Sequence, residues 1–150
     1  STLLASSAAS DVYKRQQLQY IRSKQRLYTM DDLGQVIKDY ECRSAIVPGY
    51  NGAGQERESL PNGNYTVSAD YPGMDLAAEQ GAAYGTFYIH TGDSRYRDIH
   101  GGGSGLADPF APYQGWVPTY GCLRMQNADG EEVSRWILDN GNSMLLEVVD

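Results

Sequence analysis

The chain has 150 residues, a net charge of −7 and a sequence isoelectric point near 4.7. This length suits one domain with its own hydrophobic core, and the 17 glycines and 12 tyrosines favour a β-rich, turn-rich domain. The acidic balance argues against nucleic acid as a partner, because phosphate binding needs a basic surface. No stretch approaches the roughly 18 apolar residues of a transmembrane helix, so no transmembrane segment is expected.

Residues 1–16 differ in character from the rest of the chain. Their apolar part resembles the tail of a secretion signal but is too short and has no basic leader. Residues 11–16 resemble a translated sequencing-adapter end. We therefore expect residues 1–16 to be an artefact or a disordered tail and residues 17–150 to form the domain, with any true signal peptide out of view.

Short strands joined by tight turns are predicted in the first half of the domain. Residues 26–30 and 35–42 read as two strands around a turn at 31–34, which predicts a hairpin. Asn62-Gly63 is a turn signal, and the alternation that follows predicts a half-buried strand over 64–68.

A short helical turn within 74–83 and a strand over 85–90 are predicted next, after a polar loop over 48–61. Residues 101–118 then form a long loop rich in Gly and Pro, and such loops inside a compact domain are usually functional or disordered. Its aromatic side chains form an ordered lid or groove wall, or only pin the loop to the body: Phe110, Tyr113 and Trp116.

A helix is predicted soon after Cys122. Asn127 or Asp129 can cap it, and Asn140-Gly141 can end it. Its apolar residues share one face: Val133, Trp136 and Ile137. A largely buried strand over 144–149 closes the chain.

Cys122 and His100 are the residues that point to chemistry. A thiol just after Gly121 can sit on a sharp turn, and the glycine run after His100 lets the imidazole approach closely. Together they are a plausible nucleophile and base for acyl transfer. The alternatives are a small buried cysteine and a structural histidine, with His90 as a rival base. A glycine-run carbonyl, Asp98 or Asp108 can orient the imidazole.

The residues next to the cysteine have alternatives of their own. Arg124 can favour the thiolate or bind a substrate carboxylate, or it can form a surface salt bridge. Tyr120 can donate its hydroxyl or its backbone N–H, or only pack. A Cys42–Cys122 disulfide is disfavoured because the proposed chemistry needs a free thiol. Two histidines and two cysteines at scattered positions support no metal site, and the glycine run lacks the lysine of a phosphate loop.

The order and spacing of these residues resemble the YkuD family, the L,D-transpeptidase catalytic domain. The family signature is a His, a spacer, then Ser/Thr-His-Gly-Cys and, one residue later, Arg or Asn. Here His100 precedes Cys122 by 22 positions, and residues 60–67 resemble the family's Thr-Pro-x-Gly-x-Tyr segment. Tyr120 stands where the family usually has its second histidine.

This resemblance implies a mainly β fold, a β-sandwich of mixed sheets with a short helix following the cysteine. It implies a cysteine acyltransferase without a cofactor that acts on peptidoglycan stem peptides through a thioester. Cys122 is then the nucleophile and His100 the base, while Gly121 and Cys122 supply oxyanion N–H groups. The residues expected to contact substrate are Arg124, Tyr120, Gly101 and Trp116.

The resemblance also implies a protein of the periplasm or cell envelope that reacts with carbapenem-type inhibitors, and we expect a monomer. Water as acceptor would make the same site an L,D-carboxypeptidase. Two other interpretations stay open: a Cys-His peptidoglycan hydrolase or effector, and a non-catalytic wall-binding module with an inert thiol.

Overall fold

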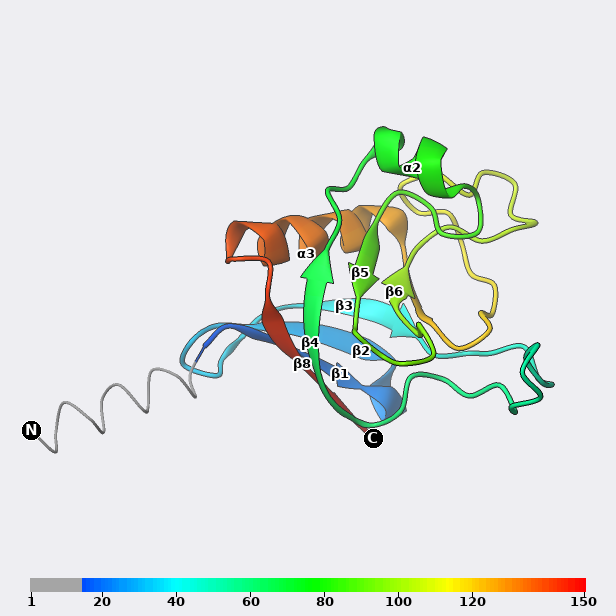
Figure 1. Cartoon of the computed structure of the whole chain (residues 1–150). Helices are drawn as coiled ribbons and strands as arrows, with labels where there is room; N and C mark the ends of the chain where they lie inside the picture. The colour runs from blue at the N-terminus through cyan, green and yellow to red at the C-terminus, as the bar shows by residue number, and fades with distance from the viewer. Residues whose placement is uncertain (1–14) are drawn as a thin grey trace, which may run out of the picture.

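The computed structural model describes residues 15–150, in which eight strands enclose the core (Figure 1). The expectation for residues 1–16 concerns a segment that, apart from Arg15 and Gln16, lies outside the described residues. The elements in chain order are β1 Gln17–Ile21, the 3₁₀ turn η1 Arg22–Lys24, β2 Arg26–Met30, β3 Val36–Arg43, β4 Gly63–Ala69, α2 Met74–Gln80, β5 Tyr88–His90, β6 Ile99–His100, β7 Leu123–Met125, α3 Asn127–Asp139 and β8 Met144–Val149.

The strands form a closed barrel in the order β1-β2-β3-β7-β6-β5-β4-β8. Two neighbouring pairs are parallel, β1 with β8 and β6 with β7, and the other six are antiparallel. β3 and β4 each pair in both halves of the barrel, so two mixed sheets face each other across one core. The predicted mainly β fold, with mixed sheets and a helix after the cysteine, is confirmed.

The predicted hairpin is formed by β2 and β3, and its turn chemistry is local. Asp31 Oδ1 accepts the backbone N–H groups of Leu33 and Gln35, at 2.9 and 2.8 Å, which closes the turn. Gly34 adopts φ +78°, a conformation that glycine enters without steric cost. These short-range interactions explain why the sequence pattern located the hairpin.

β8 alternates between inside and outside, which corrects the expectation of a largely buried strand. Met144, Leu146 and Val148 point into the core, whereas Leu145 is 40% exposed. Only one face of a strand in this barrel meets the interior, so successive side chains alternate. β1, which the sequence analysis did not predict, lies parallel to β8 and adds Leu18 and Tyr20 to the core.

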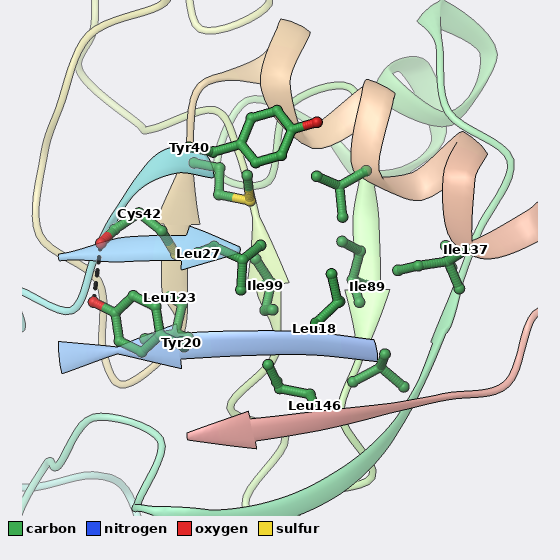
Figure 2. Close-up of a cluster of buried hydrophobic side chains, with 14 of the residues drawn as sticks. Leu18, Tyr20, Leu27, Tyr40, Cys42, Ile89, Ile99, Leu123, Ile137 and Leu146 are labelled. Carbon is green, nitrogen blue, oxygen red and sulfur yellow. Dashed lines mark hydrogen bonds between the residues drawn. The ribbon is translucent and has the colours of Figure 1, made fainter. Parts of the chain in front are cut away.

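The core fills the space between the barrel strands and the buried face of α3 (Figure 2). Val133 and Ile137 of α3 are fully buried there, as predicted, and Trp136 packs at the edge. Cys42 is also fully buried, and its carbonyl oxygen accepts the hydroxyl of Tyr20 at 2.9 Å. Cys42 and Cys122 are both free thiols.

The predicted cap of α3 is wrong. Gln126 occupies the N-cap position without a side-chain hydrogen bond to the helix, and Asn127 is the first helical residue. The side chain of Asn127 binds neighbouring loops instead of its own helix. The tertiary partners of Asn127 therefore outweigh its local capping preference.

Candidate active site

Cys122 and His100 are brought to the same cavity by the parallel pairing of β6 and β7. The register pairs Ile99 with Leu123 and His100 with Arg124, so residues far apart in sequence become lateral neighbours. The cavity measures about 500 Å³. Its lining residues are Val47, Ala83, Tyr84, Arg95, Tyr96, Arg97, His100, Ser104, Val117, Pro118, Thr119, Tyr120, Gly121, Cys122 and Arg124.

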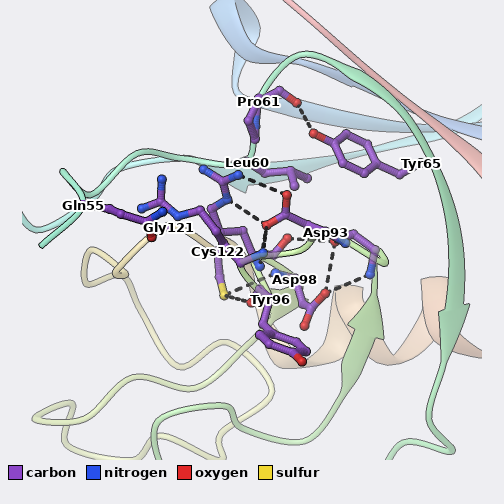
Figure 3. Close-up of polar contacts among 12 residues, drawn as sticks. Gln55, Leu60, Pro61, Tyr65, Asp93, Tyr96, Asp98, Gly121 and Cys122 are labelled. Carbon is purple, nitrogen blue, oxygen red and sulfur yellow. Dashed lines mark hydrogen bonds and ion pairs between the residues drawn. The ribbon is translucent and has the colours of Figure 1, made fainter. Parts of the chain in front are cut away.

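Two backbone groups face the sulfur of Cys122 (Figure 3). The N–H of Asp98 donates to Sγ at 3.4 Å, and the thiol points to the carbonyl oxygen of Tyr96 at 3.7 Å. Tyr96 adopts φ +56°, which is uncommon for a residue with a side chain. Burial raises the pKa of the Cys122 thiol to about 11, so the thiol is protonated at neutral pH.

Gly121 is required by the close packing before the cysteine. It has φ +146°, and a Cβ there would lie 2.8 Å from the carbonyl oxygen of Glu58 and 2.9 Å from Cγ of Arg97. Its N–H donates to Oγ1 of Thr119 at 3.1 Å, and that hydroxyl donates to the carbonyl of Cys122 at 2.7 Å. The Gly121 N–H therefore already has a hydrogen-bond acceptor within the loop.

The N–H groups on either side of Gly121 are differently placed. Within residues 15–150, neither the N–H of Tyr120 nor that of Cys122 has a hydrogen-bond acceptor. Unpaired backbone donors beside a nucleophile are the groups that can bind a developing oxyanion. The sequence analysis expected Gly121 and Cys122 in this role, and the geometry offers Tyr120 and Cys122.

His100 is a buried, neutral imidazole whose Nδ1 already has a hydrogen-bond partner. The residue is 3% exposed, and Nδ1 lies 2.9 Å from the carbonyl oxygen of Gly101. A carbonyl only accepts, so Nδ1 carries the hydrogen and Nε2 is left as the basic nitrogen. Burial lowers the pKa of His100 to about 4. The rings of Tyr84 and Tyr88 flank the imidazole, with centroids at 4.9 and 6.1 Å.

Arg124 lies beneath the cavity and is 5% exposed. Its guanidinium donates to the carbonyl oxygens of Gly101 at 3.2 Å, Ala83 at 3.2 Å and Pro118 at 3.3 Å, and also to that of Val117. None of the carboxylates in residues 15–150 lies within 4 Å of it. Arg124 thus binds the glycine run to the loop before the cysteine.

The other residues that were predicted to contact substrate differ in their surroundings. Tyr120 lines the cavity and is 70% exposed, with the guanidinium carbon of Arg57 4.4 Å from its ring centroid. Gly101 and Trp116 are not among the lining residues: Gly101 acts through its carbonyl, and the ring of Trp116 lies under Arg43 at 4.2 Å. This aromatic ring of the long loop is therefore covered by a side chain of the barrel.

His90, the rival base, lies outside the cavity. It is exposed, and its Nε2 lies 3.0 Å from Oδ1 of Asp70. Among residues 15–150, no three His, Cys, Asp or Glu side chains gather as a metal site would require. No helix in the same part of the chain is long and apolar enough to cross a membrane.

Asn127 supports the site from below, and the sequence analysis missed this role. Its Oδ1 accepts the N–H groups of Thr86 and Gly102, both at 3.2 Å. Its Nδ2 donates to the carbonyls of Pro109 at 2.9 Å and Ala111 at 2.8 Å. One buried amide thus links the glycine run to the long loop, and the only signal in the sequence was an asparagine at a predicted helix start.

Comparison with known proteins identifies the family of the chain. Residues 16–146 match the YkuD family, described as the L,D-transpeptidase catalytic domain, and the chain belongs to this family. No curated protein matches the chain.

Solved L,D-transpeptidases share the fold. The structure from Xylanimonas cellulosilytica DSM 15894 aligns with 89% of this chain at 17% identity and a TM-score of 0.52. That from Stackebrandtia nassauensis aligns with 89% at 13% identity and a TM-score of 0.53. The chain spans 59% and 54% of these two solved chains, respectively.

Proposed function

We propose that this domain is a cysteine acyltransferase that performs L,D-transpeptidation on peptidoglycan stem peptides in the cell envelope. The observation that carries the proposal is that Cys122 and His100 line one cavity in a chain of the YkuD family. The stem-peptide substrate and the envelope location follow from family membership. The roles of the individual residues follow from the contacts described above.

In the proposed reaction, Sγ of Cys122 attacks the carbonyl between the third stem residue and the terminal D-residue. Nε2 of His100 accepts the thiol proton while the S–C bond forms and the carbonyl electron pair moves to oxygen. The N–H groups of Tyr120 and Cys122 bind that oxygen. The C–N bond then breaks, and His100 returns the proton to the leaving amine. A second amine attacks the thioester, the S–C bond breaks, and His100 carries one amine proton to the sulfur, which restores the thiol.

The protonation states of the two groups constrain this mechanism. The high pKa of the thiol and the low pKa of the imidazole leave both groups neutral at pH 7. Proton transfer is therefore expected to accompany the attack, once the substrate carbonyl is in place. This differs from enzymes in which a lowered thiol pKa stores a thiolate beforehand.

Arg124 is proposed to act on the site from below. Its donated hydrogen bonds to four carbonyls orient the loop and the acceptor of His100. Tyr120, at the rim, is proposed to contact the stem peptide in place of the usual family histidine. Trp116 is left out of this proposal because, unlike Tyr120, it does not line the cavity.

The same thiol also favours a second candidate function, that of a non-catalytic module. A raised pKa is what an inert cysteine in a non-catalytic wall-binding module would have. Intact-mass measurement after exposure to a carbapenem decides between the two. Wild type is expected to gain one drug mass, and Cys122→Ala none, while Cys42, fully buried, stays unmodified. Absence of an adduct on folded wild type at high drug concentration favours the non-catalytic module.

The acceptor is tested with purified muropeptides. Cross-linked dimers that depend on Cys122 and His100 identify an amine acceptor and support transpeptidation. Trimmed monomers without dimers identify water and assign the site to carboxypeptidase chemistry. His100→Gln keeps a polar side chain of similar size and is expected to lose either product, because it has no basic nitrogen for the thiol proton.

A further inference from the structure

Asp98 is a buried carboxylate whose charge the mechanism above does not use. It is 4% exposed, and Oδ2 accepts the hydroxyl of Tyr88 at 2.6 Å. Oδ1 accepts the N–H of Thr91 at 2.8 Å and its hydroxyl at 3.1 Å. Within residues 15–150, no Lys, Arg or His nitrogen lies within 4 Å of this carboxylate. An anion buried without a cation is costly even when hydrogen bonded.

The backbone of Asp98 binds both Cys122 and the residue that follows it. Its N–H donates to the sulfur of Cys122 at 3.4 Å, whereas its carbonyl oxygen accepts the N–H of the next residue, Leu123, at 2.9 Å. Because β6 and β7 are parallel, Asp98 lies opposite Cys122 and directly before the strand that carries His100. Asp98 is therefore hydrogen bonded to the segment that contains Cys122, and it directly precedes β6, the strand that contains His100.

The side chain of Asp98 reaches the base through Tyr88. The ring of Tyr88 lies nearly parallel to the imidazole of His100, with an interplanar angle of 14° and 6.1 Å between centroids. Tyr88 is also paired with His100 in the β5–β6 ladder. The hydroxyl at the far end of this ring is fixed on the Asp98 carboxylate.

We propose that Asp98 is a positioning residue of the Cys122–His100 pair: it fixes the sulfur through its N–H and faces the pair with the negative charge that an imidazolium requires. This inference rests on the proposed function. When the thiol proton moves from Sγ to Nε2 of His100, the buried imidazole becomes a cation. The carboxylate of Asp98 then supplies a nearby opposite charge, and no other co-reactant is needed.

The charges around the site agree with this role. Burial dominates the pKa of both reacting groups, the negative charge of Asp98 raises both pKa values, and the positive charge of Arg124 lowers both. Two opposite charges thus flank the proton-transfer pair. Charged and titratable groups face the pair from several elements. They are Asp98 before β6, Arg124 on β7, Tyr88 on β5, Tyr84 in the preceding loop, Asp93 with its partner Arg97 in the turn, Arg95 and Tyr96 in the same turn, and Tyr120 before the cysteine.

Asp98→Asn tests the inference by two readouts with opposite expected signs. Removing the charge is expected to move the alkylation of Cys122 by iodoacetamide to lower pH, by about one pH unit. Acylation by a carbapenem, which needs a cation on His100, is expected to slow about tenfold or more. A packing defect alone would not make the thiol more reactive to iodoacetamide and, at the same time, less reactive in acylation. The opposite signs therefore distinguish loss of the charge from loss of packing.

Asp70→Asn is the matched control, because Asp70 is an exposed carboxylate bonded to His90 outside the cavity. It is expected to leave both readouts unchanged. Tyr88→Phe keeps the ring beside His100 and removes one donor from Asp98, so the carboxylate charge acts more strongly and the alkylation profile moves to higher pH. If Asp98→Asn does not fold, the alkylation profile of Tyr88→Phe tests the inference in its place.

An alkylation profile of Asp98→Asn that coincides with wild type, or lies at higher pH, overturns the inference. So does a Tyr88→Phe profile that coincides with wild type or lies at lower pH. Iodoacetamide needs no substrate site, so these outcomes are separate from the proposed function. That function fails on its own evidence if wild type takes up no carbapenem.

Discussion

Arg124 and His100 share one hydrogen-bond acceptor, the carbonyl oxygen of Gly101. Nε of Arg124 donates to it at 3.2 Å, and Nδ1 of His100 lies 2.9 Å from it. The orientation of the imidazole therefore depends on a guanidinium that is two residues from Cys122 in the chain. A change at Arg124 is expected to affect His100 through this one oxygen.

Arg124→Lys should reveal this dependence. Lysine keeps the charge but lacks the planar fork, so several of the four buried carbonyls lose their donor. We expect the free energy of unfolding in urea to fall by about 2–4 kcal/mol and carbapenem acylation to slow about tenfold or more. Arg135→Lys, on the exposed side of α3, is the control and should change neither. Unchanged acylation in a folded Arg124→Lys protein would contradict the positioning role.

The stability of the domain should depend on pH through His100. Burial lowers its folded-state pKa from 6.5 to about 4, so the unfolded chain binds a proton in this range that the folded protein excludes. The contribution is complete above pH 6.5, falls as the pH drops toward 4, and is absent below. It amounts to about 3 kcal/mol.

Urea unfolding of wild type and of His100→Gln, from neutral pH down to pH 4, measures this contribution. Other groups titrate in both proteins, so the difference between the two curves isolates the imidazole. We expect that difference to change steadily between pH 6.5 and 4. Parallel curves would mean that His100 is not buried as a neutral group.

Asn127→Ala should loosen the loops behind the cavity. The substitution removes the acceptor of two N–H groups and the donor to two carbonyls, all in a buried position. Unpaired buried polar groups are costly, so the free energy of unfolding is expected to fall by about 2–4 kcal/mol. Asn140→Ala, at the exposed end of α3, removes a single bond to Trp136 and should cost less than about 1 kcal/mol. Equal losses in the two variants would refute the special role of Asn127.

Gly130→Ala should destabilise the protein although alanine favours helices. A Cβ at Gly130 in α3 would lie 2.0 Å from ring atoms of Phe87, which is fully buried. The clash is expected to lower the free energy of unfolding by about 1–3 kcal/mol, against a helix-propensity gain of about 1 kcal/mol. Gly52→Ala, with no heavy atom within 4 Å, is the control and should be close to neutral. A more stable Gly130→Ala protein would show that Phe87 moves freely.

Much of the fold was predictable because its signals are local. The turn of the β2–β3 hairpin depends on Asp31 and Gly34, and both act within four residues. β2 and β8 have the predicted bounds, and α3 ends at the predicted Asn140-Gly141 signal. The alternation of β8 was missed because a run of apolar residues does not say how many faces of a strand are buried.

The candidate site was predictable in its chemistry and less so in its contacts. Cys122 and His100 were indicated by residue type, order and spacing, and the carbonyl of Gly101 was among the groups expected to orient the imidazole. The engaged N–H of Gly121 and the covered ring of Trp116 were not foreseeable. Both depend on a hydroxyl or guanidinium whose position only the folded chain fixes.

By itself, the sequence determined the family, the mainly β architecture and the identity of the thiol and imidazole, since these are properties of residue type and short-range pattern. Only the tertiary structure decided that Asp98 lies opposite Cys122 and that Arg124 binds carbonyls. It also decided that burial raises the pKa of Cys122 and lowers the pKa of His100. The physical reason is that burial, charge pairing and strand register arise between segments far apart in the chain, which meet only when the barrel closes.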